Sequence, residues 1–186
     1  MNNITIRPLQ SSDKVDVERI CIATASPELC KNENMREYTL NMYNRYYTRV
    51  VSHSFVAVND QDKPIGYILC APDYNLYKKD FFKNELKEIR KLGIGKYLFS
   101  RSEVVFYKKY SKEYPAHLHI DILPEYQGMH IGTNLMNTLL EYLKDKGVKG
   151  LMLSVAPQNK GAIAFYESCG FNVLSNRPAL VYGIKL

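Results

Sequence analysis

A chain of 186 residues falls within the length range of one domain and is long enough to bury a core, so we expect a single domain over residues 1–186. With 46% apolar residues but no run near the roughly 18 to 20 apolar residues of a membrane span, and with no signal-peptide pattern, the composition excludes a membrane protein and favours the cytoplasm. The net charge of +6 raises the hypothesis of nucleic-acid binding, but no recognised binding motif accompanies it, and we expect a smaller anionic ligand instead.

The first part of the chain predicts a strand, two helices and a hairpin. Alternating apolar and polar residues ended by a proline are typical of a strand, and apolar residues at three- or four-residue steps are typical of helices. Two β-rich runs joined by polar turn residues are typical of a hairpin. These patterns place the strand at 2–9, the helices at 11–25 and 34–51, and the hairpin strands at 55–58 and 65–70.

Residues 73–115 are basic, aromatic and helical in pattern, and we interpret them as a helical insertion between strands 3 and 4. Eleven Lys or Arg against six Asp or Glu leave +5 of the net charge in this segment. It contains RKLGIG, Arg90 to Gly95, which has the R-x-x-G-x-G spacing of a phosphate-binding loop. Because this stretch follows a helical pattern, we expect its glycines to end one helix and start another segment.

The second part of the chain predicts strands alternating with helices, and therefore an α/β fold. AHLHIDIL, residues 116–123, alternates as a strand with His117, His119 and Asp121 on one face. An amphipathic helix, a buried strand, a short helix and one or two strands follow, at 133–147, 150–157, 159–170 and 171–186.

QGMHIG, Gln127 to Gly132, lies in the setting that a pyrophosphate requires. It comes after a strand and opens the clearest amphipathic helix, so that backbone N–H groups and the positive end of the helix dipole converge on an anion. Its spacing matches the R-x-x-G-x-G pattern less well than RKLGIG does. The setting nevertheless favours QGMHIG as the phosphate site.

Two blocks of the sequence resemble the GNAT (Gcn5-related) N-acetyltransferases. IDILPEYQGMHIGTNLMNTLLEYL looks like the acetyl-CoA motif of that family, and LSVAPQNKGAIAFYESCGF looks like its second signature, a strand followed by Asn159 and, seven residues on, Tyr166. The resemblance runs in detail from Ala116 to about Leu174. It implies a mixed central sheet whose strands splay at the acetyl-CoA site, with helices on both faces.

The resemblance also implies a set of residues that bind acetyl-CoA. The backbone of the splayed strand would pair with the pantetheine arm as an added strand, and the loop after it would line the pyrophosphate mostly with N–H groups. Asn159 matches a further cofactor contact. The implied cofactor-binding residues are Ile120, Asp121, Ile122, Gln127, Gly128, Met129, His130, Ile131, Gly132, Thr133 and Asn159.

His130 departs from the family, which has glycine at this position. Glycine is favoured where the backbone approaches an anion closely, so a side chain there would either weaken cofactor binding or place its imidazole against a phosphate. The departure keeps open a second function, a catalytically silent GNAT-fold module that binds CoA or a protein partner.

Acetyl transfer to an amine needs a base and an acid. An amine with a pKa of about 10.4 is only about one part in a thousand neutral at pH 7, so a base must take its proton, and an acid assists departure of the CoA thiolate. Tyr166 matches the usual acid of the family, with a core tyrosine as the alternative. One usual position of the basic glutamate holds Ser154. Asp121, His119 and His117, which share one strand face, are the candidate bases, with a polar cluster on that face as the alternative.

We therefore predict an acetyl-CoA-dependent N-acetyltransferase that acts by direct attack in a ternary complex, with Tyr166, Asp121 and His119 as catalytic residues. The acceptor would be a primary amine of a small molecule or peptide. Four scattered cysteines without a C-x-x-C pair predict no metal site and buried, reduced thiols. The C-terminal strands are compatible with a homodimer.

Overall fold

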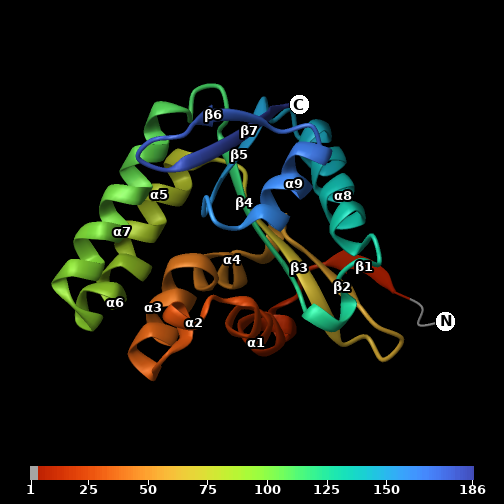
Figure 1. Ribbon diagram of the computed structural model, residues 1–186, viewed down its shortest axis with the longest axis horizontal. Helices are drawn as coiled ribbons and strands as arrows, with labels where there is room; N and C mark the ends of the chain where they lie inside the picture. Colours follow the sequence, from red (N-terminus) through yellow and green to blue (C-terminus); the bar gives the residue numbers. More distant parts are fainter. Residues whose placement is uncertain (1–3) are drawn as a thin grey trace.

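The computed structural model describes residues 4–186, which form one mixed sheet of seven strands with helices on both faces (Figure 1). The strand order is β1-β2-β3-β4-β5-β7-β6, and only the β4–β5 pair is parallel. This architecture confirms the predicted α/β class. The strands are β1 (Thr5–Pro8), β2 (Phe55–Val58), β3 (Pro64–Ala71), β4 (Ala116–Ile122), β5 (Gly150–Val155), β6 (Asn172–Ser175) and β7 (Leu180–Lys185).

The helices include the amphipathic ones that the sequence predicts. They are α1 (Lys14–Thr24), α2 (Pro27–Cys30), α3 (Glu33–Tyr43), α4 (Arg45–Arg49), α5 (Tyr74–Lys83), α6 (Glu85–Leu92), α7 (Ile94–Phe106), α8 (Ile131–Asp145) and α9 (Lys160–Ser168).

The single helix predicted over 34–51 is wrong, because the chain breaks it at Asn44. This residue leaves the helical conformation (φ −133°, ψ −56°) and is fully buried. Its side-chain amide donates a 3.3 Å hydrogen bond to the carbonyl of Val17 in α1. The chain is therefore divided at Asn44 into α3 and α4, and the side chain at the break is held by α1, a contact that the local pattern does not contain.

The basic segment after the hairpin forms α5, α6 and α7 between β3 and β4, on the left in Figure 1. Gly93 ends α6 with φ of 143°, a value that side chains disfavour, and α7 begins at the next residue. The prediction that the glycines of RKLGIG end one helix and start another segment is confirmed. This stretch joins two helices and does not follow a strand.

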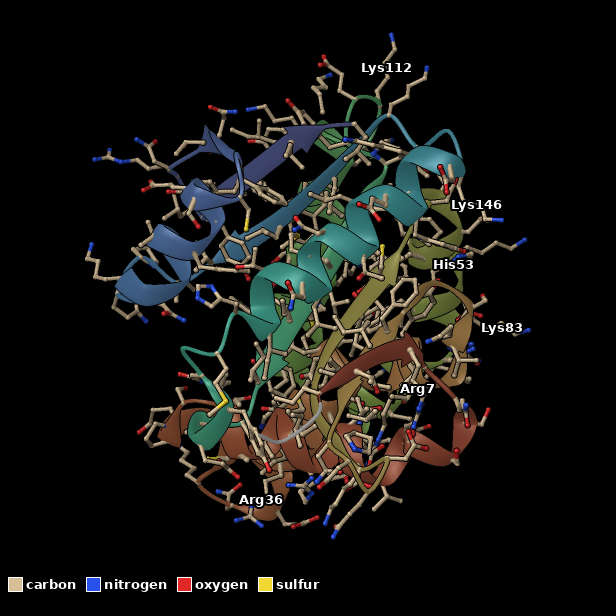
Figure 2. The ribbon with its side chains drawn as sticks, turned by 90° about the vertical axis from the view of Figure 1, so that its right-hand side faces the viewer. Arg7, Arg36, His53, Lys83, Lys112 and Lys146 are labelled. Carbon is tan, nitrogen blue, oxygen red and sulfur yellow. The ribbon has the colours of Figure 1, made fainter. Side chains whose placement is uncertain are left out.

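The two faces of the sheet are covered by different helices. Leu135, Met136 and Leu139 of α8 are fully buried, and α8 packs on β2, β3 and β4, while α1 and α4 pack on the opposite face. Figure 2 looks onto α8, which crosses the sheet between α9 and the C-terminal strands on one side and β1, with Arg7, on the other. No helix within residues 4–186 is both long and apolar enough to cross a membrane.

Strands β4 and β5 separate soon after they meet, as the resemblance implied. Their pairing covers only Ala116 with Leu151 and His117 with Met152. Beyond this point Ser154 of β5 is exposed although its strand lies inside the sheet. The gap between the two strands positions the site.

The cysteines are all free. Cys21 and Cys70 are buried, as predicted, but the prediction of burial is wrong for Cys30 and Cys169, which are half-buried because they lie near helix ends at the surface. Among residues 4–186, no group of three or more His, Cys, Asp or Glu side chains is arranged to hold a metal ion.

Candidate active site

A cavity of about 550 Å³ lies beside the splayed end of β4, against the N-termini of α8 and α9. Ten of the eleven residues predicted to bind the cofactor line it. They are Ile120, Asp121, Ile122, Gln127, Gly128, His130, Ile131, Gly132, Thr133 and Asn159. The predicted catalytic Tyr166 lines it as well, whereas the side chain of Met129 is exposed and lines a separate groove beside β1.

The start of α8 presents unused backbone donors to this cavity. The first hydrogen bond of the helix runs from Asn134 N to His130 O, so the N–H groups of Ile131, Gly132 and Thr133 have no partner within the helix. Gly128 and His130 have φ of 79° and 59°, and such left-handed residues turn neighbouring N–H groups to the same side. The arrangement suits a phosphate group.

His130 occupies a backbone conformation that favours glycine. Its φ of 59° and ψ of 10° place it in the left-handed region, which costs a residue with a Cβ atom about 1 kcal/mol or more. The glycine of the family therefore has a conformational reason at this position, in addition to the close approach of an anion. In this chain the imidazole is exposed at the cavity.

Gly132 allows α8 to approach α9. A Cβ atom at this position would lie 3.3 Å from Phe165 of α9 and 3.3 Å from Ile122 of β4, tighter than ordinary contact. Asn159 caps α9, because its Oδ1 accepts a 3.1 Å hydrogen bond from Ala162 N. The amide nitrogen of Asn159 stays available to a ligand in the cavity.

Asp121 lines the cavity, and its carboxylate accepts a hydrogen bond from the hydroxyl of Tyr67, its register partner on β3. Burial raises the pKa of Asp121 to about 6, because lost hydration outweighs the stabilising hydrogen bond from Tyr67. A carboxylate with this pKa is ionised at pH 7 and still basic enough to accept a proton.

His117 and His119 share the strand face of Asp121 but lie in a different environment. The Nε2 atom of His117 is 2.7 Å from the hydroxyl of Tyr47, and the residue is buried. The ring of His119 lies 5.4 Å from that of Tyr43 and 5.3 Å from that of Tyr47. Burial lowers the pKa of His119 to about 4 and that of His117 to about 3, so both imidazoles are neutral at pH 7.

Tyr166, near the end of α9, is 8% exposed and faces the same cavity. Burial and the charge of Asp121 raise its pKa above the usual value, so the phenol keeps its proton at neutral pH. Among residues 4–186, no protein group engages its hydroxyl in a hydrogen bond. A protonated phenol and an ionised carboxylate thus border one cavity.

The comparison with protein families matches residues 21–171 to the acetyltransferase (GNAT) family. The chain belongs to the GNAT family. The uncharacterized N-acetyltransferase of Methanocaldococcus jannaschii is 43% identical over 109 residues, which cover 59% of this chain and 34% of that protein. The chain thus spans about a third of the length of this curated relative.

Solved structures of similar fold cover nearly the whole chain. SsHAT is 25% identical with a TM-score of 0.85, over 98% of each chain. The PaiA N-acetyltransferase of Thermoplasma acidophilum, solved in complex with coenzyme A, is 18% identical with a TM-score of 0.63 over 99% of each chain, a likeness that shows the fold alone.

The GNAT cavity also contains residues that the sequence interpretation missed. The position of Phe165 next to Tyr166 could have identified it as a lining residue. Nothing in the local pattern marks Thr24 at the end of α1 as one. Tyr67 is missed for the same reason, since its hydrogen bond to Asp121 depends on the β3–β4 register.

Proposed function

We propose that this GNAT-family chain is an N-acetyltransferase that binds acetyl-CoA in the cavity at the start of α8. The observation that carries the proposal is the coincidence of two features in one cavity: unused N–H groups at Ile131, Gly132 and Thr133, and the pair of Asp121 and Tyr166. The N–H groups fit the pyrophosphate, and the edge of β4 that β5 leaves unpaired at Ile120 and Ile122 fits the pantetheine arm. On this edge the carbonyl of Ile122 accepts a 2.9 Å hydrogen bond from Gln127 Nε2, which the arm would have to displace.

Bound acetyl-CoA supplies a thioester whose carbonyl carbon is attacked by the amine, with loss of the CoA thiolate. Asp121 accepts the proton that the amine nitrogen gives up as it forms the new C–N bond. Tyr166 donates its phenolic proton toward the leaving sulfur as the C–S bond breaks, and solvent returns that proton. His119 stays a candidate for the proton relay, although its low pKa makes it a weaker base than Asp121.

The acceptor in this proposal is a primary amine of a small molecule or peptide, which attacks directly in a ternary complex. The exposed Ser154 at the splay takes the place of the basic glutamate that the family carries at one position, so the base comes from β4. The cytoplasmic location and the homodimer stay predictions from the sequence.

The test is calorimetric titration with acetyl-CoA of the wild type, His130→Gly and a control, Met129→Ala, followed by turnover with a panel of amines. We expect micromolar binding by the wild type and turnover of at least one amine. Binding only by His130→Gly would mean that the imidazole closes the site, and binding without turnover would indicate the catalytically silent CoA-binding module. Loss of binding in Met129→Ala would contradict the assignment of Met129 to a separate groove.

A further inference from the structure

Glu103 is a carboxylate on the inward face of α7 that no group within the described part of the chain neutralises. It is half-buried, and its helix neighbours Ser100, three residues before, and Tyr107, four residues after, are buried. Within residues 4–186, its side chain forms no ion pair or hydrogen bond, whereas nine other acidic side chains of the first 88 residues pair with Lys or Arg. An unpaired and partly desolvated carboxylate is costly unless something binds it.

The position of Glu103 lies between two contacts that join α7 to the rest of the molecule. Ser100 Oγ donates to the hydroxyl of Tyr38 in α3 across 3.3 Å, and the hydroxyl of Tyr107 donates to Ser154 Oγ in β5 across 2.6 Å. Ser154 borders the gap between β4 and β5. The carboxylate therefore faces the space between α3 and the splayed strand.

Four tyrosines from three segments share the electrostatic field of this carboxylate. Burial raises the pKa of each of their hydroxyls, and the negative charge of Glu103 adds to the rise in all four. They are Tyr38 and Tyr43 of α3, Tyr77 of α5 and Tyr107 after α7. Aromatic faces and a carboxylate together attract a cation, since both present negative potential.

This cluster lies on the same sheet face as the proposed base. The ring of Tyr43 is 5.4 Å from that of His119, and His119 precedes Asp121 by two residues on β4, a spacing of about 7 Å along a strand. Tyr43, His119 and Asp121 are all half-buried, so each keeps accessible surface. A chain of partly accessible groups thus leads from Asp121 toward Glu103, away from the start of α8.

We propose that Glu103, with the tyrosines around it, binds a second cationic group of the acceptor, so that the preferred acceptor is an amine with a second positive charge, such as a linear diamine. This inference rests on the proposed transfer of an acetyl group to an amine. Burial raises the pKa of Glu103 to about 7, and a bound cation would hold the carboxylate in its ionised form. One amine would then lie at Asp121 while the other is held by Glu103.

The experiment compares kcat/KM for the diamines from propane-1,3-diamine to hexane-1,6-diamine with n-alkylamines of matching length. We expect the wild type to prefer its best diamine over the matching alkylamine by about 10- to 100-fold, the gain typical of a charge-assisted hydrogen bond. Glu103→Gln should remove that preference through KM while leaving kcat with the alkylamine and the Kd of acetyl-CoA unchanged. The matched control is Glu88→Gln in α6, whose exposed carboxylate pairs with Lys91 and should not affect the preference.

An unchanged preference in Glu103→Gln would overturn the inference, and so would a wild type that prefers alkylamines. An equal fall in kcat for both amine classes would also overturn it, because Glu103 would then act on the proton. If Glu103→Gln does not fold, as judged by thermal unfolding, Glu103→Asp takes its place, with the diamine preference expected to fall.

The inference and the proposed function are separated by a binding measurement. If no amine is acetylated, calorimetric titration of the CoA-loaded protein with butane-1,4-diamine decides the matter. Binding by the wild type and its loss in Glu103→Gln would support the cation site although the proposed activity has failed. Equal binding by both proteins, or binding by neither, would overturn the cation site.

Discussion

Tyr107 and Ser154, 47 positions apart in the sequence, are joined by a 2.6 Å hydrogen bond from the tyrosine hydroxyl to Ser154 Oγ. The bond connects the end of α7 to β5 at the point where β5 has separated from β4. It holds the basic, aromatic segment of the chain against the sheet, beside the gap between β4 and β5. Glu103, one helical turn before Tyr107, is positioned by the same contact.

The energetic role of this bond can be measured with a double-mutant cycle. We expect Tyr107→Phe and Ser154→Ala each to lower the free energy of unfolding by about 1 kcal/mol, and the double variant to lose little more than either alone. Urea unfolding of the four proteins gives the coupling. Additive losses would mean that the two side chains do not stabilise each other.

Asp121 is expected to set the acidic limb of the pH profile. Its pKa of about 6 means that kcat/KM falls as the pH drops through about 6, where the base becomes protonated. Asp121→Asn should lower kcat about 100-fold or more. Tyr67→Phe removes a hydrogen bond that favours the ionised carboxylate, so the pKa of Asp121 rises and the limb moves to higher pH.

The control for the Tyr67 variant is Tyr47→Phe. Tyr47 is also fully buried on this sheet face, but its hydroxyl pairs with His117 instead of the carboxylate. The acidic limb of the kcat/KM profile of Tyr47→Phe should stay near the wild-type position. A limb that moves equally in both variants, or in neither, would assign the titration to another group.

Tyr166→Phe is expected to lower kcat about 100-fold while leaving the Kd of acetyl-CoA unchanged, because only the proton for the leaving sulfur is lost. Tyr182→Phe is the matched control: its ring lies 6.5 Å from that of Tyr166, but its hydroxyl donates to Glu167. Steady-state kinetics measure the loss of kcat, and calorimetry measures the Kd of acetyl-CoA. A Tyr166→Phe protein with normal kcat and reduced thermal stability would make Tyr166 a core residue.

His130 provides a test of backbone strain in the loop before α8. Because its φ is 59°, His130→Gly should be more stable to urea than His130→Ala by about 1 kcal/mol, the cost of a Cβ atom in the left-handed region. Gly132→Ala does not test backbone strain, because at that position the neighbours Phe165 and Ile122 must move to admit the methyl group. Equal stability of the Gly and Ala variants at position 130 would mean that the loop has another conformation in solution.

The local pattern of the sequence determined most of the elements and the choice of QGMHIG as the candidate phosphate loop. Periodicity and turn residues act over a few positions, so they locate β4, the start of α8 and the end of α6 at Gly93 without knowledge of the fold. The choice of QGMHIG over RKLGIG depended on whether a strand or a helix comes first, which is also local information. The assignment of Asn159 and Tyr166 to the site followed from the resemblance to the GNAT family.

Only the tertiary structure decided how side chains on one strand face differ. His117 and Asp121 are equivalent in the strand pattern, yet Tyr47 covers the first, and the second reaches the cavity with Tyr67 beside it. The break at Asn44, the partner of Ser154 and the unpaired state of Glu103 likewise depend on contacts between distant segments. Burial, strand register and charge pairing act through space, so no window of neighbouring residues contains them.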